Sequence, residues 1–437
     1  MKANESVKNY PSSLRMYTNY TVREIKKICQ SIGPRPSGSE SERKAQEHIA
    51  DEMKTCCDKV AVEDFKMSKY AFMAWVPIAS ILTTISMILN FVGIPVVGIV
   101  LIAFTLAMVV GEFVTYSEFL DPVFPKINSC NAIGVRSAKG EAKQRIVFCG
   151  HSDSAYEWSF TYWGGSAMLF GASIYAVVGI VVVLATSILT LIFGGENAPQ
   201  WLAIVKYAQL AFVPGFIVVL FFTNFRRPVT GANDNLTGAI SAVAIAKYLE
   251  DNGIEFENTE VVSMASGCEE GGLRGAKAYT KAHMDELKAI PTMFIAMDTF
   301  KDFADINIYA KDMTGTVKNH PGVCSLLKAG GRRAGLDLKY ESVYVGASDA
   351  AAVTKLGVPA ATLAAMNPGP PRYYHTRLDT VEELEPKNVE KCLDICLQSL
   401  FIYDEYGFKD NYDDVDYEGT PVSPKEYKKS RTLTAKR

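Results

Sequence analysis

The sequence predicts an α/β fold in which a soluble domain with a largely parallel sheet is interrupted by two α-helical transmembrane hairpins. In the second half of the chain, apolar runs of strand length alternate with helical segments, a pattern typical of sheets that are buried on both faces. Two long blocks, 71–111 and 164–225, are strongly apolar. A bilayer core takes about 20 apolar residues per helix, so each block is long enough for two spans.

Composition narrows the range of partners and compartments. A chain of 437 residues can hold one large or two ordinary domains. The net charge of -3 gives no reason to expect a nucleic-acid partner. The nine cysteines lack the spacing of a disulfide framework, which favours a reducing compartment. Residues 1–16 contain no apolar segment, so no secretory signal is expected.

The soluble segments are expected to form one discontinuous domain. Its parts are 1–70, 112–163 and 226–403, and the charged tail 404–437 follows. Residues 19–57 have helical periodicity, broken by a loop rich in Gly, Pro and Ser at 32–39. Strands are predicted at 59–65, 131–136, 145–150, 259–266 and 291–297, and later helices at 275–288, 323–334, 347–356 and 386–403.

The two apolar blocks read as hairpins that leave and return on the same side of the membrane. Block 71–111 has no charged residue, and Gly93-Ile-Pro95 supplies its turn. In block 164–225, residues 194–200 form the connection, and Lys206 is the only charge of the second span, close enough to its end to reach the interface. A membrane hairpin explains about forty uncharged residues better than a buried core helix does.

Basic residues near the span ends predict the orientation. Lys66, Lys69, Arg226 and Arg227 flank the spans on the soluble side, whereas the short far loops carry none. By the positive-inside rule, the soluble domain faces the cytosol. We therefore expect an integral protein of the plasma membrane, in contact with the lipid bilayer.

Side chains that can bind metal ions follow three of the predicted strands. His151 ends the strand 145–150, Glu269 and Glu270 follow 261–268, and Asp298 follows 294–297. Functional residues of open α/β sheets gather at the carboxyl ends of strands, so these groups are expected to meet. Each residue alone is compatible with an ordinary polar strand end.

Two further segments supply the remaining candidates. Asp234 lies in the polar turn 231–238 before an apolar helix, where the simplest reading is a helix cap. His375 lies in Arg372-Tyr-Tyr-His-Thr-Arg-Leu-Asp379. Histidine and carboxylate ligands without cysteine suit zinc in a hydrolytic site. A carboxylate that is not a ligand is also needed to shuttle a proton, and adjacent Glu269 and Glu270 can divide these two tasks.

Together these motifs resemble metallopeptidase family 28, whose members are co-catalytic di-zinc aminopeptidases and carboxypeptidases. The resemblance covers about residues 19–70, 128–160 and 228–403, and it includes the segment Ile32–Ser39. It implies a three-layer sandwich of the zinc exopeptidase type with a mostly parallel mixed sheet. It also implies two zinc ions per chain and hydrolysis of peptide bonds by zinc-activated water. The motifs are His151-x-Asp153, Asn233-Asp234-Asn235, Glu269-Glu270, Met297-Asp298, Ser348-Asp349 and Tyr374-His375-Thr-x-x-Asp379.

The resemblance assigns roles to these residues. One zinc is expected on His151 and Asp298, and the other on Glu270 and His375, with Asp234 bridging. The resemblance further implies three supporting features: Glu269 is the general base, Asp153 orients His151, and the Asp234–Asn235 peptide bond is cis. Asp349 and Asp379 match positions near the site.

The leading hypothesis is a membrane-anchored di-zinc exopeptidase, an aminopeptidase ahead of a carboxypeptidase. Both hairpins depart from the family pattern, since each is inserted into the fold, and they suggest membrane-associated peptides as substrates. One alternative is a single-zinc acyltransferase of the glutaminyl cyclase type. Another is a non-enzymatic membrane receptor or transporter-like protein on the same scaffold. The sequence leaves the oligomeric state and the substrate sequence open.

Overall fold

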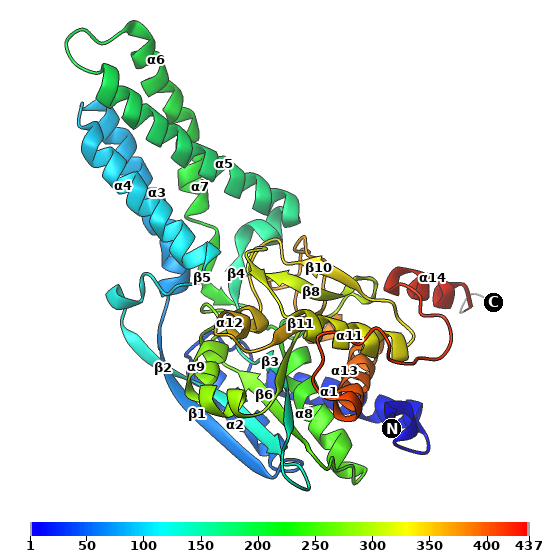
Figure 1. The fold of residues 1–437 in the computed structure, drawn as a ribbon. Helices are drawn as coiled ribbons and strands as arrows, with labels where there is room; N and C mark the ends of the chain where they lie inside the picture. The colour runs from blue at the N-terminus through cyan, green and yellow to red at the C-terminus, as the bar shows by residue number, and fades with distance from the viewer. Residues whose placement is uncertain (1, 435–437) are drawn as a thin grey trace.

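The computed structural model of the chain describes residues 2–434. An α/β body carries a bundle of long helices that projects from one end (Figure 1). A nine-stranded mixed sheet runs through the body in the order β1-β2-β6-β3-β7-β11-β8-β10, with β9 on β8. The strands are β1 (Lys59–Ser68), β2 (Lys126–Arg136), β3 (Gln144–His151), β6 (Thr259–Ser266), β7 (Thr292–Phe300), β8 (Ile306–Asp312), β9 (Val317–Lys318), β10 (Lys339–Ser342) and β11 (Ala360–Ala365).

Parallel pairing is concentrated in the centre of the sheet. The four strands β6, β3, β7 and β11 run parallel, whereas β1, β2 and β6 pair antiparallel and β8 runs antiparallel to β11. The central strands are buried along most of their length, as their continuous apolar sequence predicts. Their carboxyl ends therefore meet at one edge.

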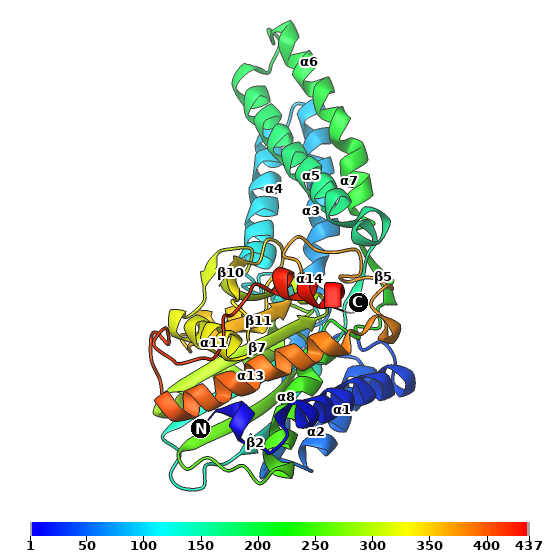
Figure 2. The ribbon, with the colours of Figure 1, turned by 90° about the vertical axis from the view of Figure 1, so that its right-hand side faces the viewer.

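Helices cover both faces of the sheet, and Figure 2 shows those of one face. On one face, α1 (Tyr10–Ser31), α2 (Glu40–Met53), α8 (Leu236–Asp251), α11 (Pro321–Arg333) and α13 (Pro386–Tyr406) share a core with alternate strand residues such as Ile146 and Phe148. On the other, α9 (Arg274–Ala282), α10 (Met284–Ala289) and α12 (Asp349–Lys355) pack against the intervening residues, such as Val147. The predicted α/β sandwich is confirmed. The single helix predicted at 275–288 is divided into α9 and α10 at His283.

Two helical hairpins form the projecting bundle. The first contains α3 (Ala71–Phe91) and α4 (Pro95–Met108), which continues as the π-helical segment η2 (Val109–Val114). The second contains α5 (Ser159–Phe193), then α6 (Gln200–Ala208), the 3-10 turn η4 (Gln209–Phe212) and α7 (Val213–Val219). Within the described residues, four helical segments, 71–91, 95–114, 159–193 and 200–219, are long and apolar enough to cross a membrane.

The returning leg of the second hairpin differs from a straight span. Pro214 has no backbone N–H to donate to the preceding turn, so the leg is divided into α6, η4 and α7. It also ends earlier than the apolar sequence suggests. Residues Thr223–Pro228 form strand β5, which pairs with β4 (Tyr156–Trp158) at the base of the bundle.

The bundle has an apolar interior and an apolar exterior. Met87, Ile102, Ile180 and Phe216 pack inside it. The outward side chains are apolar as well, and each is between 53% and 62% exposed: Ile81, Ile88, Val100, Ile174, Val181, Ile192 and Phe221. Soluble proteins rarely expose so large a continuous apolar surface, so the exterior suits lipid.

Each hairpin is inserted between paired strands of the body. β1 and β2 pair antiparallel, with Phe65 opposite Ser129, and the first hairpin lies between them in the chain. Its return is tied to α9 because Arg274 pairs with Asp121 Oδ1 at 2.6 Å and with Glu118 Oε2 at 3.0 Å. The insertion of this hairpin between two strands agrees with the sequence analysis.

Two glycines allow α8 to approach the sheet closely. A Cβ on Gly150 of β3 would lie 2.2 Å from the carbonyl carbon of Gly238, in the first turn of α8. A Cβ on Gly238 would lie 2.2 Å from the carbonyl oxygen of Met297 in β7. The absence of these side chains lets the start of α8, and Asp234 just before it, lie against the ends of β3 and β7.

Replacing Gly150 with Ala should therefore push α8 away from the sheet. Overpacking of this kind costs about 1–3 kcal/mol of unfolding free energy, and the variant should also retain less zinc. Thermal unfolding and metal content of purified protein in detergent would measure both effects. Gly171→Ala in α5 is the matched control, because a Cβ there meets nothing within 4 Å. Equal stability of the two variants would contradict the close approach.

Candidate metal centre

The structure brings the five predicted ligands together at the carboxyl edge of the central strands. His151 is the last residue of β3, and Asp298 lies near the end of β7. Glu270 follows β6, Asp234 precedes α8, and His375 lies in the loop after β11. All five side chains lie in the interior or are only slightly exposed. Because β6, β3, β7 and β11 run parallel, their carboxyl ends bring four of these ligands to one edge, and the turn before α8 adds Asp234.

Asp234 lies between the two imidazoles. Its Oδ1 is 3.2 Å from His151 Nε2, and its Oδ2 is 3.3 Å from His375 Nε2. The Asp234–Asn235 peptide bond is cis, as the resemblance implied. The side chain of Asn235 accepts a hydrogen bond from Gly238 N and so caps α8. Asp234 is thus both close to the start of a helix and shared between two histidines.

Two groups of potential metal ligands share Asp234. The first contains His151, Asp234 and Asp298, and the second contains Asp234, Glu270 and His375. Within each group, the donor atoms lie within 4.8 Å of one another. Glu270 Oε2 is 3.2 Å from His375 Nε2. These are the groupings that the resemblance implied for two ions bridged by one carboxylate.

The cluster concentrates negative charge in the protein interior. Burial raises the pKa of Glu269 well above its ordinary value, and Glu270 adds to the shift while His151 opposes it. Burial, with the nearby charge of Asp234, raises the pKa of Asp298 to about 7. For His375, burial lowers the pKa, but the charges of Glu270 and Asp234 outweigh it and raise the pKa to about 10. Burial is thus the largest cause of the raised pKa values of the two carboxyl groups, and the facing carboxylates add to it, whereas for His375 the facing carboxylates outweigh burial.

These residues fit a zinc-type cation. The donors are imidazole nitrogens and carboxylate oxygens without thiolate, a set that suits zinc in hydrolytic sites. Glu270 Oε1 is buried and has no hydrogen-bond partner among the described residues. Bound cations would offset the repulsion that raises the carboxylate pKa values.

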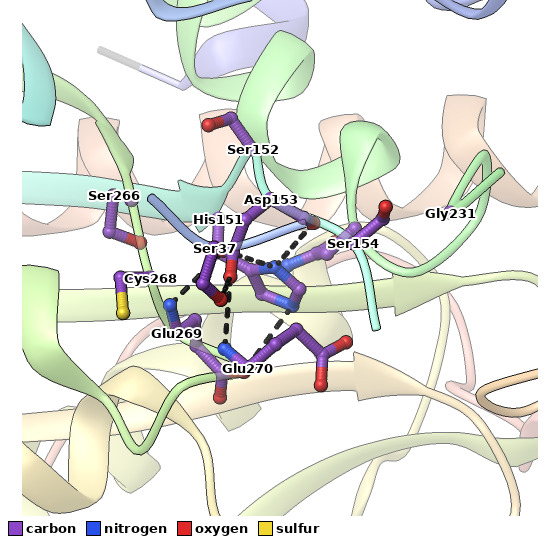
Figure 3. Close-up of polar contacts among 12 residues, drawn as sticks. Ser37, His151, Ser152, Asp153, Ser154, Gly231, Ser266, Cys268, Glu269 and Glu270 are labelled. Carbon is purple, nitrogen blue, oxygen red and sulfur yellow. Dashed lines mark hydrogen bonds and ion pairs between the residues drawn. The ribbon is translucent and has the colours of Figure 1, made fainter. Parts of the chain in front are cut away.

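Asp153 organises the first half of the site (Figure 3). Its carboxylate accepts hydrogen bonds from the backbone N–H groups of Glu269 and Glu270, both at 3.1 Å, and from the Ser37 hydroxyl at 2.6 Å. His151 Nδ1 lies 3.4 Å from Asp153 Oδ1. One buried carboxylate thus positions both glutamates and the ring of His151.

Glu269 and Glu270 point to different parts of the cluster. Glu270 faces His375, whereas Glu269 Oε2 lies 3.8 Å from His151 Nε2. Glu269 belongs to neither of the two groups that share Asp234, although it forms a third group of potential donors with His151 and Glu270. The side chain also lines the cavity next to the cluster. The position suits a group that exchanges protons with a bound molecule.

The two aspartates that match positions near the site support its backbone. Asp379 accepts hydrogen bonds from the backbone N–H groups of Asn233, at 2.9 Å, and Asp234, at 3.0 Å. Asp349 accepts one from the Ser266 hydroxyl at 2.5 Å. Both lie behind the ligands, in agreement with their expected supporting place.

Sequence reasoning did not single out two residues that hold the ligand loops. Arg35 is fully buried and donates to the carbonyl oxygens of Ser152 and Gly231, at 2.7 and 2.9 Å, which joins the loop after His151 to the loop before Asp234. Its segment, 32–39, was part of the resemblance. The ring of Trp158 packs edge-on against that of His375 with ring centroids 4.4 Å apart, and its position just before the second apolar block gave no signal.

Comparison with known proteins agrees with this architecture. Residues 218–400 match Peptidase family M28. That match contains Asp234, Glu269, Glu270, Asp298 and His375, and it confirms the resemblance to metallopeptidase family 28. The chain has no significant match among curated proteins.

Solved structures share the fold at low sequence identity. An aminopeptidase from Aneurinibacillus sp. strain AM-1 has a TM-score of 0.52 at 14% identity, covering 94% of this chain and 99% of its own. BSAP, a zinc aminopeptidase from Bacillus subtilis, has a TM-score of 0.52 at 14% identity, covering 91% and 98%. A glutaminyl cyclase from an Acidobacteriales bacterium gives 0.52 at 14%, covering 90% and 96%. At this identity the likeness establishes the fold.

Replacing Asp153 with Asn should weaken metal binding without unfolding the protein. The amide keeps one acceptor oxygen but turns its NH2 group either toward the Glu269 N–H or toward the donors of Ser37 and Glu270. Loss of such a supporting carboxylate typically lowers metal affinity about 10–100-fold. Zinc affinity would be measured by competition with a chelator, and folding by circular dichroism. Ser37→Ala, which removes one of the donors, should have a smaller effect; unchanged affinity in Asp153→Asn would refute this role.

Proposed function

We propose that this chain is a membrane-anchored zinc exopeptidase with two zinc ions, an aminopeptidase ahead of a carboxypeptidase. The observation that carries the proposal is the position of Asp234, whose two carboxylate oxygens face His151 and His375 at 3.2 and 3.3 Å. The M28 match over residues 218–400 and the zinc-suited donor set support the same reading.

The residues divide into two binding groups in this proposal. His151 and Asp298 would hold one ion, Glu270 and His375 the other, and Asp234 would contact both. Zinc bound there would supply Lewis acidity, which lowers the pKa of water and stabilises negative charge on a carbonyl oxygen. Asp153 and Trp158 keep the ring planes of His151 and His375 in place.

Glu269 is the proton-transferring residue in this scheme. It is buried, its pKa is raised, and it belongs to neither of the groups that share Asp234. A carboxylate in such a position can accept a proton from the attacking water and later donate it to the leaving amine. Peptide hydrolysis requires both transfers, because the amine nitrogen leaves poorly unless it is protonated.

Membrane anchoring is the second half of the proposal. Four apolar helices of 20 to 35 residues and the apolar exterior of the bundle support it. Lys66, Lys69, Arg226 and Arg227 border the bundle on the side of the α/β body, which favours a cytosolic body at the plasma membrane. Membrane-associated peptides are the corresponding substrates.

A second candidate is an acyltransferase of the glutaminyl cyclase type. The glutaminyl cyclase named above matches the fold with the same TM-score as the aminopeptidases. A single-zinc site would favour this candidate, whereas the two groups sharing Asp234 favour two ions. The number of zinc ions per chain therefore separates the two readings.

Glu269→Gln should lower kcat by about 10²–10⁴-fold while zinc content stays close to that of the wild type, because an amide cannot transfer the proton. Glu270→Gln is the matched control, since it removes a proposed ligand and should lose zinc. Turnover and metal content of both purified variants would be measured in parallel. Zinc loss in Glu269→Gln with zinc retained in Glu270→Gln would reverse the two roles.

Chelation should abolish peptide cleavage, and added zinc should restore it. Purified protein in detergent would be assayed on peptides with free or blocked N- and C-termini, and on an N-terminal glutaminyl peptide, before and after chelator treatment. Cleavage at the free N-terminus with about two zinc ions per chain is the expected result. Cyclisation of the glutaminyl peptide with one zinc per chain would establish the alternative, and cleavage that survives chelation would end the metal mechanism.

A further inference from the structure

A cavity continues from the metal centre into the helical bundle. Its volume is about 230 Å³, and Glu269, Glu270 and His375 line one end of it. Residues of α3, α5 and α7 line the other end, among them Thr83 and Ile180. The metal centre is therefore open toward the segments that the proposed function places in the membrane.

The depth of the cavity corresponds to one leaflet of a bilayer. Along α3 its lining extends from Phe72 to Thr83, and along α5 from Leu169 to Ile180. At the rise of an α-helix, eleven residues cover about 16 Å. The hydrocarbon core of a bilayer is about 30 Å thick, so one leaflet accounts for about 15 Å. An amino-acid side chain of a peptide held at the metal centre would fill only the mouth of such a cavity.

The wall within the bundle is apolar. Most of its side chains are aliphatic or aromatic, such as Ala79, Ala176 and Phe216. The hydroxyls of Ser80 and Thr83 also line it, but they donate to the backbone carbonyls of Phe216 and Ala79, at 2.6 and 2.7 Å. A peptide backbone placed here would lose its hydrogen bonds with water and find few replacements, whereas a hydrocarbon chain loses none.

The charged lining residues are few and do not lie deep in the bundle. Glu269 and Glu270 belong to the metal centre, and Lys69 precedes α3. Lys69 makes no ion pair with a described residue, although its ammonium lies 5.0 Å from the ring centroid of Tyr70. The lining thus offers a free cation for a carboxylate, but no acidic side chain beyond the two glutamates for a terminal ammonium group.

One residue of the cavity wall also belongs to the outer surface of the bundle. Val177 of α5 lines it and is 52% exposed. This residue lies in the apolar segment of α5, where the exterior faces lipid under the proposed function. Under the proposed function, this part of the cavity wall therefore separates the cavity from lipid.

We infer that the substrates of this site are long-chain N-acyl amino acids, with the acyl chain in the cavity and the amide at the metal centre. The inference rests on the proposed amide hydrolysis. In the inferred substrate, a fatty acyl group stands where a peptide substrate has its N-terminal residue. Water oxygen forms a bond to the acyl carbon and the C–N bond breaks. The proton taken up by Glu269 passes to the nitrogen. The products are a fatty acid and a free amino acid. Before cleavage, the carboxylate of the amino-acid part of the substrate pairs with Lys69.

The test is a chain-length series. Purified protein in detergent would be given N-acetyl-, N-octanoyl- and N-palmitoyl-glycine, N-palmitoyl-glycyl-glycine, and leucine p-nitroanilide as the aminopeptidase substrate. Hydrolysis of palmitoyl-glycine at least tenfold faster than acetyl-glycine is expected. Cleavage of leucine p-nitroanilide without any palmitoyl substrate would overturn the inference and leave the proposed function standing. Failure on every substrate would reject the proposed function itself. Cleavage of the palmitoyl dipeptide alone would show that the substrates are lipopeptides and not N-acyl amino acids, and it would overturn the inference.

Cavity variants separate the acyl-chain site from the chemistry. Ala176→Phe should fill the cavity and lower palmitoyl-glycine hydrolysis at least tenfold, with acetyl-glycine hydrolysis unchanged. Ala185→Phe, on the exposed side of α5, is the matched control and should change neither. Binding of radiolabelled palmitoyl-glycine to the Glu269→Gln variant gives a readout without turnover, and it should be lost when Ala176→Phe is added. Unchanged binding in that double variant would place the chain elsewhere and refute the inference.

A variant of Lys69 tests the binding of the substrate carboxylate independently of the acyl chain. Lys69→Gln should raise KM for palmitoyl-glycine severalfold and leave kcat unchanged, because the variant loses only the partner of the substrate carboxylate. Palmitoyl-glycinamide, which lacks that carboxylate, should be unaffected by the change. An equal rise in KM for palmitoyl-glycine and palmitoyl-glycinamide would show that Lys69 does not bind the substrate carboxylate and would overturn this part of the inference.

Discussion

The carboxylate of Asp234, shared between two imidazoles, is the interaction on which the rest of the site depends. It requires α8 to begin against the ends of β3 and β7, and that approach is possible because Gly150 and Gly238 have no side chain. Asp379 fixes the backbone of Asp234, and Arg35 joins the neighbouring loops. Without the close approach of α8, the other ligands would lie at one edge of the sheet with no common partner.

Most of the body and the cluster could be predicted from the sequence. Long apolar strands in alternation with helices determine the sandwich, and polar residues at three strand ends determine where ligands gather. The pairing of β1 with β2 across the first hairpin follows from strands that the sequence places on either side of it. The strands and the ligands at their ends follow from local patterns and general rules of sheet topology, whereas the assignment of Asp234 and His375 as ligands came from the resemblance to metallopeptidase family 28.

Other features depend on contacts between distant segments, which a single sequence does not reveal. The packing of Trp158 on His375 joins positions more than two hundred residues apart. The π-helical continuation of α4 and the pairing of β4 with β5 likewise depend on the surrounding structure. The cavity also depends on contacts between distant segments, because its wall combines residues from three helices with residues of the metal centre.

The junctions of the hairpins have a practical consequence for protein engineering. The strand β4 that leads into α5 carries Trp158, whose ring supports a proposed ligand, and the return of the first hairpin is clamped to α9 through Arg274. Excision of the apolar helices to obtain a water-soluble fragment would leave Trp158 and the partners of Arg274 close to the cut ends of the chain, and it would remove the part of the cavity wall that α3, α5 and α7 supply. Biochemical experiments should therefore use protein that keeps both hairpins and is purified in detergent micelles or nanodiscs.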